Sequence, residues 1–139
     1  MSFTGKCACG GVTATITADA PTAVVQCWCR QCQQVCGGGP AHNAFFANVD
    51  MVLSGSLASH AYPTATGQTI SQFFCPRCGT PVLSRHSGVP DSAAVRLGFL
   101  DPGHGLAPGV AMWLAEAPDW AAVPEGLPRF ETQPGPPQS

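Results

Sequence analysis

The sequence predicts an all-β (β-rich) fold built of antiparallel hairpins, with few and short helices. Segments rich in β-branched residues recur along the chain, as in Gly-Val-Thr-Ala-Thr-Ile-Thr-Ala at residues 11–18. Turn signals such as Ser54-Gly55-Ser56 and Thr66-Gly67 separate these segments at short intervals. The 16 glycines and 14 prolines favour turns over long helices, and 45% hydrophobic residues suffice for a core.

The expected elements follow from this pattern, taken in order from the N-terminus. Strands are expected at residues 11–18, 22–26, 44–49, 58–62, 69–74, 82–86, 94–100 and 110–114. Gly37-Gly38-Gly39-Pro40 breaks the chain between the second and third of them. A short helix is expected at residues 30–35. A second is expected at residues 118–123, where Pro118 and Asp119 suit a helix start.

The length of 139 residues is typical of one domain, and no linker or internal repeat divides the sequence. We therefore expect residues 1–130 to form a single domain. The last nine residues read Glu-Thr-Gln-Pro-Gly-Pro-Pro-Gln-Ser and contain no apolar side chain that could anchor them. This composition predicts a flexible C-terminal tail over residues 131–139.

Charge and hydropathy argue against two classes of partner, nucleic acids and membranes. The chain has six Lys and Arg residues and a net charge of −2, so it lacks the clustered positive charge that nucleic-acid binding needs. No apolar run approaches the ~20 residues of a membrane-spanning helix, and no apolar signal core follows the N-terminus. We therefore expect a cytoplasmic protein with neither a nucleic-acid nor a membrane partner, whose thiols stay reduced.

The eight cysteines fall into three clusters, which favours metal binding over disulfides in a reducing compartment. The clusters are Cys7-Ala8-Cys9, Cys27-Trp28-Cys29-Arg30-Gln31-Cys32 and Cys75-Pro76-Arg77-Cys78. Residues i and i+2 of an extended strand share one face, so each Cys-x-Cys pair can offer two sulfurs on one side. A Cys-x-x-Cys turn followed by glycine also brings two thiolates together.

Zinc is the metal that this arrangement favours, because structural zinc takes four tetrahedral ligands and catalytic zinc keeps three protein ligands. Joining the first and third clusters gives a closed site of four ligands, Cys7, Cys9, Cys75 and Cys78. The middle cluster then gives an open site of three ligands, Cys27, Cys29 and Cys32. An open zinc ion can bind and deprotonate an incoming thiol and polarise a carbonyl. We expect two zinc ions per chain on this basis.

Other interpretations of the cysteines stay open at this point. Cys75-Pro76-Arg77-Cys78 resembles a redox dithiol motif, although the βαβ setting of such motifs is missing. Iron–sulfur ligation is a further alternative, although the spacing matches no familiar ferredoxin pattern. Cys36 lies four residues after Cys32, where it could close the second tetrahedron or serve as a small buried residue.

Together, the motifs resemble those of the glutathione-dependent formaldehyde-activating enzymes, a family grouped with centromere protein V. The matching elements are Cys-x-Cys-Gly-Gly-Val at residues 7–12, Cys-x-Cys-x-x-Cys at 27–32 and Phe-Cys-x-x-Cys-Gly-x-Pro at 74–81. Further similar landmarks are Leu100-Asp101-Pro102, Trp113, Trp120 and Leu127-Pro128-x-Phe130. The chain differs from the family where Trp28 replaces a frequent His, and where Gln33 and Gln34 replace a basic pair.

The resemblance implies a small β-tent of stacked sheets with a structural zinc ion at the first and third clusters. It implies a labile zinc ion, associated with glutathione, at the catalytic residues Cys27, Cys29 and Cys32. The implied reaction adds a thiol to a small aldehyde such as formaldehyde, or reverses that addition, as a carbon–sulfur lyase does. The proton for the oxygen would come from water or from one of the histidines, His42, His60, His86 and His104. The alternative is a non-catalytic zinc module that binds a partner or a thiol ligand.

Overall fold

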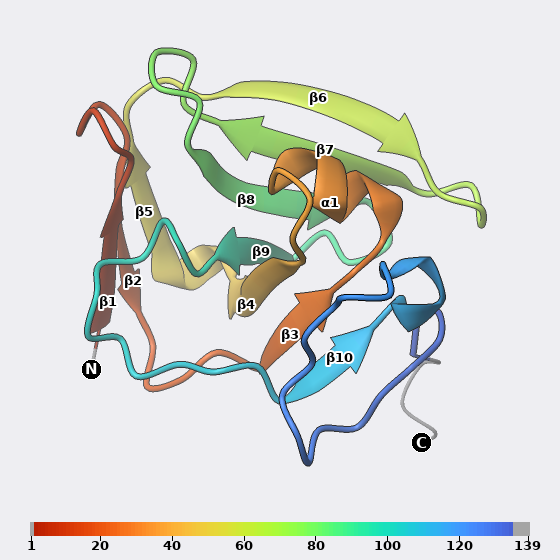
Figure 1. Ribbon diagram of the computed structural model, residues 1–139. Coiled ribbons are helices and arrows are strands. Elements are labelled where there is room, and N and C mark those ends of the chain that lie inside the picture. The colour runs from red at the N-terminus through yellow and green to blue at the C-terminus, as the bar shows by residue number, and fades with distance from the viewer. Residues whose placement is uncertain (1, 135–139) are drawn as a thin grey trace. The chain divides into compact units, whose positions relative to one another are not determined.

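The computed structural model describes residues 2–134 and confirms the β-rich fold class (Figure 1). Its strands belong to two sheets. The chain divides into two compact units: the first comprises the residues up to Thr22 together with Ala44–Leu106, and the second comprises Ala23–Asn43 together with the residues from Ala107 onward. Strand β4 (Ala41–Ala47) carries the chain from the second unit into the first.

The first unit is almost entirely β-structure. It contains β1 (Ser2–Lys6), β2 (Thr13–Thr17), the 3-10 helix η1 (Asn48–Asp50), β5 (Met51–Ser54), β6 (Ala58–Pro63), β7 (Thr69–Phe74), β8 (Pro81–His86) and β9 (Ser92–Arg96). Strands β1, β2 and β5 form an antiparallel three-stranded sheet, and β9, β8, β7 and β6 are consecutive neighbours in the other sheet. Figure 1 shows β6, β7 and β8 lying side by side.

The core of the first unit follows from the alternation of buried and exposed side chains. Phe3 and Gly5 on β1 face inward with Ala14 and Ile16 on β2, and the rings of Phe3 and Phe46 lie 5.3 Å apart. A Cβ atom at Gly5 would lie 2.7 Å from the Phe99 ring, so only glycine permits this approach.

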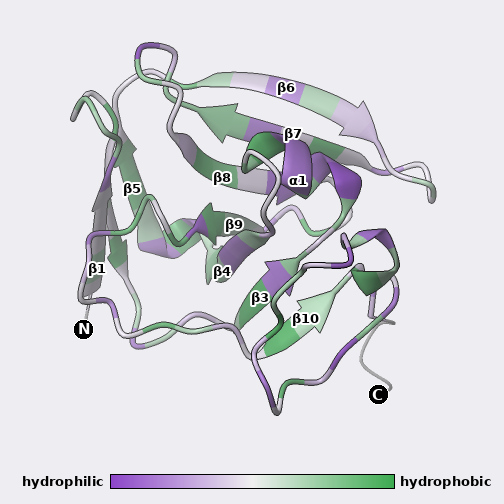
Figure 2. Ribbon diagram, in the orientation of Figure 1, coloured by the Kyte–Doolittle hydropathy of each residue, from purple (hydrophilic) through white to green (hydrophobic). Residues whose placement is uncertain are grey.

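The second unit is smaller. It contains β3 (Ala23–Cys27), the helix α1 (Arg30–Val35), β10 (Val110–Met112) and the 3-10 helix η2 (Leu114–Glu116). Strand β10 pairs with β3 in parallel, with Met112 opposite Cys27. Most of α1 is hydrophilic, as its Arg and Gln residues dictate (Figure 2).

One expected helix was wrong, and two strands were missed. The helix expected at residues 118–123 is a turn, in which the Ala121 N–H donates to the Pro118 carbonyl over 3.0 Å. Trp120 is 71% exposed there, so the segment buries too little apolar surface to stabilise a helix. Strands β1 and β5 were also not anticipated, because both are short and β1 contains the strand-breaking Gly5.

The single domain over residues 1–130 stays a prediction. Of the expected tail, residues 135–139 lie outside the described residues, whereas the backbone carbonyl of Thr132 accepts a 3.3 Å hydrogen bond from the Trp113 N–H. In the part of the chain that the structure describes, no helix has the length and apolarity needed to cross a membrane.

Candidate metal centres

Two tight turns in the first unit carry four cysteines. After β1, the Gly10 N–H donates to the Cys7 carbonyl over 3.0 Å, and after β7 the Gly79 N–H donates to the Cys75 carbonyl over 2.9 Å. Both glycines have φ of 77°, in the left-handed region that other residues avoid. The two turns therefore have the same design, in which a glycine lets the chain fold back beside a pair of thiols.

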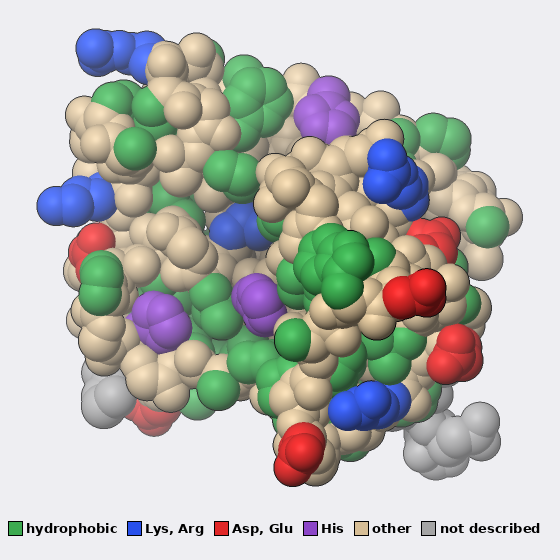
Figure 3. Space-filling view, viewed as in Figure 1, with side chains coloured by type: hydrophobic (Ala, Val, Ile, Leu, Met, Phe, Trp, Pro, Cys, Tyr) green, Lys and Arg blue, Asp and Glu red, His purple; other side chains and the backbone are tan. Residues whose placement is uncertain are grey.

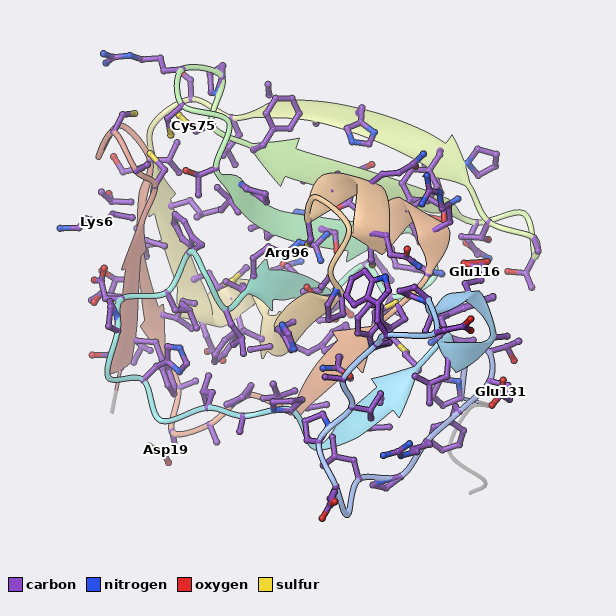
Figure 4. All side chains as sticks on the ribbon, viewed as in Figure 1. Lys6, Asp19, Cys75, Arg96, Glu116 and Glu131 are labelled. Carbon is purple, nitrogen blue, oxygen red and sulfur yellow. The ribbon has the colours of Figure 1, made fainter. Side chains whose placement is uncertain are left out.

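The four sulfur atoms of these turns lie together. The Sγ atoms of Cys7, Cys9, Cys75 and Cys78 are all within 4.8 Å of one another. The Cys7–Cys9 distance is 3.6 Å and the Cys9–Cys75 distance is 3.7 Å. Four zinc–sulfur bonds of ~2.3 Å in a tetrahedron would place the sulfurs about 3.8 Å apart, whereas a disulfide is about 2.05 Å long. Figure 4 shows Cys75 in the turn between β7 and β8, with other sulfur atoms close by.

Hydrogen-bond donors favour the thiolate form at two members of this cluster, Cys7 and Cys78, whereas the neighbouring thiols and burial raise the pKa of Cys9 to about 11. The Val12 N–H donates to Cys7 Sγ over 3.2 Å. The Thr80 hydroxyl lies 3.2 Å from Cys78 Sγ and accepts from the Ala8 N–H, so it links the two turns. Thr80, through its hydroxyl and its backbone, is the main cause that lowers the pKa of Cys78 to about 5. Thiolate is the form that binds metal.

The second cluster lies where β3 ends and α1 begins. The Sγ atoms of Cys27, Cys29 and Cys32 are all within 4.8 Å of one another. Cys27 is the last residue of β3, and Cys29 is the N-cap of α1, whose sulfur accepts a 3.4 Å hydrogen bond from the Cys32 N–H. Cys36 caps the other end of α1, is exposed, and does not belong to this group of three.

The three thiols of the second cluster share protons unequally. Hydrogen bonds with Cys27 and Cys32 lower the pKa of Cys29 to about 3. Hydrogen bonds with Cys29 and Cys32, together with burial, raise the pKa of Cys27. The mutual hydrogen bonds of the three thiols therefore favour the thiolate form at Cys29 and the protonated form at Cys27.

Trp28, between the first two cysteines of this cluster, is fully buried at 2% exposure. Its backbone N–H donates to the Met112 carbonyl over 3.0 Å, which extends the β3–β10 pairing past Cys27. Its ring meets Trp120 edge to face, with the centroids 6.2 Å apart. The backbone between Cys27 and Cys29 is thus fixed by its hydrogen bond to β10.

A polar relay runs from Trp28 to His42 through Gln26. The indole Nε1–H donates to Gln26 Oε1 over 3.0 Å, and Gln26 Nε2 lies 3.1 Å from His42 Nε2. An indole can only donate, so it fixes the amide with Nε2 toward the histidine, and His42 Nε2 must accept. His42 is therefore the neutral tautomer with its proton on Nδ1, and burial lowers its pKa.

Comparison with known families decides the relationship of the chain. Residues 2–116 match the family described as "GFA: Glutathione-dependent formaldehyde-activating enzyme". The chain belongs to this family. A crystal structure of a Rhodobacter sphaeroides protein shares the fold, with a TM-score of 0.58, 22% sequence identity, and coverage of 76% of this chain and 91% of that one. No curated protein sequence matches the chain.

The structure therefore gathers the seven cysteines into the two groups that the sequence predicted, and both groups could hold metal ions. Sequence reasoning missed Gln26, which accepts from the Trp28 indole, and also Gln33 and Glu116, which bond backbone groups of residues 27–32. The replacement of the family's basic pair by Gln33 and Gln34 was the one signal that pointed to this region. On the face that Figure 3 shows, the blue Lys and Arg side chains are each surrounded mainly by side chains of other kinds.

Proposed function

We propose that the chain is a zinc-dependent, carbon–sulfur lyase-like enzyme that adds a thiol such as glutathione to a small aldehyde such as formaldehyde, or reverses that addition. The observation that carries the proposal is the group of three thiols at Cys27, Cys29 and Cys32, outside which Cys36 lies. Three protein ligands leave a coordination position for a substrate, whereas four thiolates close a zinc site.

Membership of the family supports the choice of glutathione and formaldehyde as the substrate class. The sulfur-only donor sets support zinc, a metal that thiolate ligands favour. On this proposal the four-cysteine cluster holds a structural zinc ion and the three-cysteine cluster holds a labile one. Thiol donors and a thiol substrate both need a reducing compartment, so we place the protein in the cytoplasm.

The proposed step balances without an oxidant or a reductant. The thiol sulfur forms a bond to the carbonyl carbon, the carbon–oxygen π bond breaks, and the thiol proton ends on the oxygen. Zinc held by Cys27, Cys29 and Cys32 would supply Lewis acidity, which lowers the pKa of a bound thiol. The chain's own residues hold the site: Trp28 fixes the backbone between two of the ligands, and its burial excludes water from that side.

The experiment that tests the proposal measures the rate of exchange between formaldehyde and its glutathione adduct by NMR, with and without the purified zinc-loaded protein. We expect acceleration above the spontaneous rate by the wild type and by Cys36→Ser, and none by Cys29→Ser. If the wild type binds two zinc ions but gives only the spontaneous rate, the chain is a non-catalytic zinc module. A rate unchanged by Cys29→Ser would contradict the assignment of the site.

A further inference from the structure

Gln33 lies on α1 one residue after Cys32, and its side chain is buried at 7% exposure. Its Nε2 atom donates to two backbone carbonyls, that of Trp28 over 2.7 Å and that of Glu116 over 2.8 Å. A carboxamide nitrogen carries two hydrogens, so both are used. The opposite orientation would set Oε1 against two carbonyl oxygens, so the partners fix the direction of the amide.

Both peptide groups that flank Cys29 depend on Gln33. The side chain holds the Trp28 carbonyl, which belongs to the peptide before Cys29, and the Gln33 backbone N–H donates to the Cys29 carbonyl over 3.0 Å. Peptide groups are planar, so holding the two carbonyls fixes φ and ψ of Cys29, which are −59° and 155°. Those angles set the direction of the Cys29 Cα–Cβ bond, which carries the sulfur.

The second carbonyl that accepts from the Gln33 side chain, that of Glu116, links α1 to η2. Trp113, at φ of 60°, is the one non-glycine residue with positive φ in residues 2–134, and its left-handed turn leads from β10 into η2. Glu116 at the end of η2 accepts from Gln33 through its carbonyl and from the Arg30 N–H through its carboxylate, over 2.6 Å. Figure 4 shows Glu116 beside α1.

We propose that Gln33 is a positioning residue for the metal centre at Cys27, Cys29 and Cys32, which holds the peptides around Cys29 so that the three thiols are assembled before a metal ion binds. This inference rests on the proposed function, since it takes that cluster to be a metal site. Groups that orient metal ligands typically change metal affinity by about 10- to 100-fold when they are removed. The amide of Gln33 should therefore set how readily this site loses its zinc.

The test compares substitutions at two adjacent glutamines of the same helix. Gln33→Glu keeps the shape of the side chain but sets a carboxylate against two carbonyls. Gln34→Glu adds the same charge at an exposed position and serves as the matched control. Gln33→Met removes the donor without adding charge. Each protein is titrated with cobalt(II), whose thiolate charge-transfer and d–d bands report affinity and tetrahedral geometry. The four-cysteine cluster is the internal reference.

We expect Gln33→Glu and Gln33→Met to weaken the second cobalt site by about 10-fold or more, with altered d–d bands. The first site, far-ultraviolet circular dichroism and the Gln34→Glu protein should match the wild type. Equal cobalt affinities and bands in all four proteins would overturn the inference, as would an equal loss at both sites, which indicates a general effect on folding. If the wild type itself binds one cobalt ion and leaves Cys27, Cys29 and Cys32 reactive, the proposed function fails, and this inference fails with it.

Discussion

The sulfur atoms of Cys9 and Cys75 lie 3.7 Å apart, although 66 residues separate them in the sequence. Their distance is close to the edge of a zinc–thiolate tetrahedron and far beyond a disulfide bond. A metal ion between them would close a long loop of the chain, including both strands β6 and β7. The stability of the first unit should therefore depend on this contact.

Replacement of one ligand of the four-cysteine cluster, as in Cys75→Ser, should destabilise the protein strongly. Loss of a structural metal is among the few mechanisms that exceed about 4 kcal/mol, and for a chain of this size that corresponds to a fall in Tm of about 10 °C or more. Calorimetry together with zinc analysis measures both effects. The control is Cys36→Ser, which changes an exposed cysteine outside both groups and should retain the wild-type Tm. A Tm for Cys75→Ser equal to that of the control would contradict the account.

Acidification should release metal from the three-cysteine cluster. The hydrogen bonds of Cys27 with Cys29 and Cys32 raise the pKa of Cys27, so its thiol keeps a proton that a metal ion must displace. For each proton that the metal ion displaces, the metal affinity should fall about tenfold when the pH falls by one unit. Cobalt titrations in the range from pH 8 to pH 6 measure this slope. An affinity independent of pH would show that metal binding displaces no proton from this cluster, which contradicts the prediction.

His42 should make the protein less stable in mild acid. Burial lowers the pKa of His42 below its ordinary value of 6.5, so the unfolded chain takes up the proton more readily than the folded chain. Its contribution to stability is therefore complete above pH 6.5 and is lost as the pH falls from there toward the folded-state pKa. Denaturant unfolding between pH 7.5 and pH 5 should show a flatter pH dependence for His42→Asn than for the wild type.

Trp28→Phe should loosen the relay to His42. The substitution removes the indole donor and leaves the buried Gln26 carbonyl without it, at a cost of about 1–3 kcal/mol. The amide of Gln26 is then free to turn, so His42 should populate both tautomers. Denaturant unfolding and long-range ¹H–¹⁵N NMR of the imidazole measure the two effects. Trp120→Phe is the control, because Trp120 is largely exposed. A pure Nδ1–H tautomer in Trp28→Phe would refute the relay.

Much of the fold and the three close-spaced cysteine motifs could be predicted because their signals are local, and the count of ligands that zinc needs then indicated which motifs join. The helix over residues 30–35 matches α1 at both ends, since a cysteine N-cap and the Gly37 breaker delimit it. Strand β1 could not be predicted, because the reason for Gly5 is the Phe99 ring more than 90 residues away. The hydrogen-bond partners of the Gln33 side chain could not be predicted either. They are main-chain carbonyls, one of them 83 residues distant, and no side-chain pattern in the sequence encodes them.

The metal content of the purified protein tests the central claim most directly. The account predicts about two zinc ions per chain, one of which a chelator removes readily while the other stays with the four-cysteine cluster. After chelation, Cys27, Cys29 and Cys32 should react with a thiol reagent, whereas Cys7, Cys9, Cys75 and Cys78 should remain protected. A single tightly held zinc ion, with the three cysteines of the middle cluster reactive from the start, would contradict it.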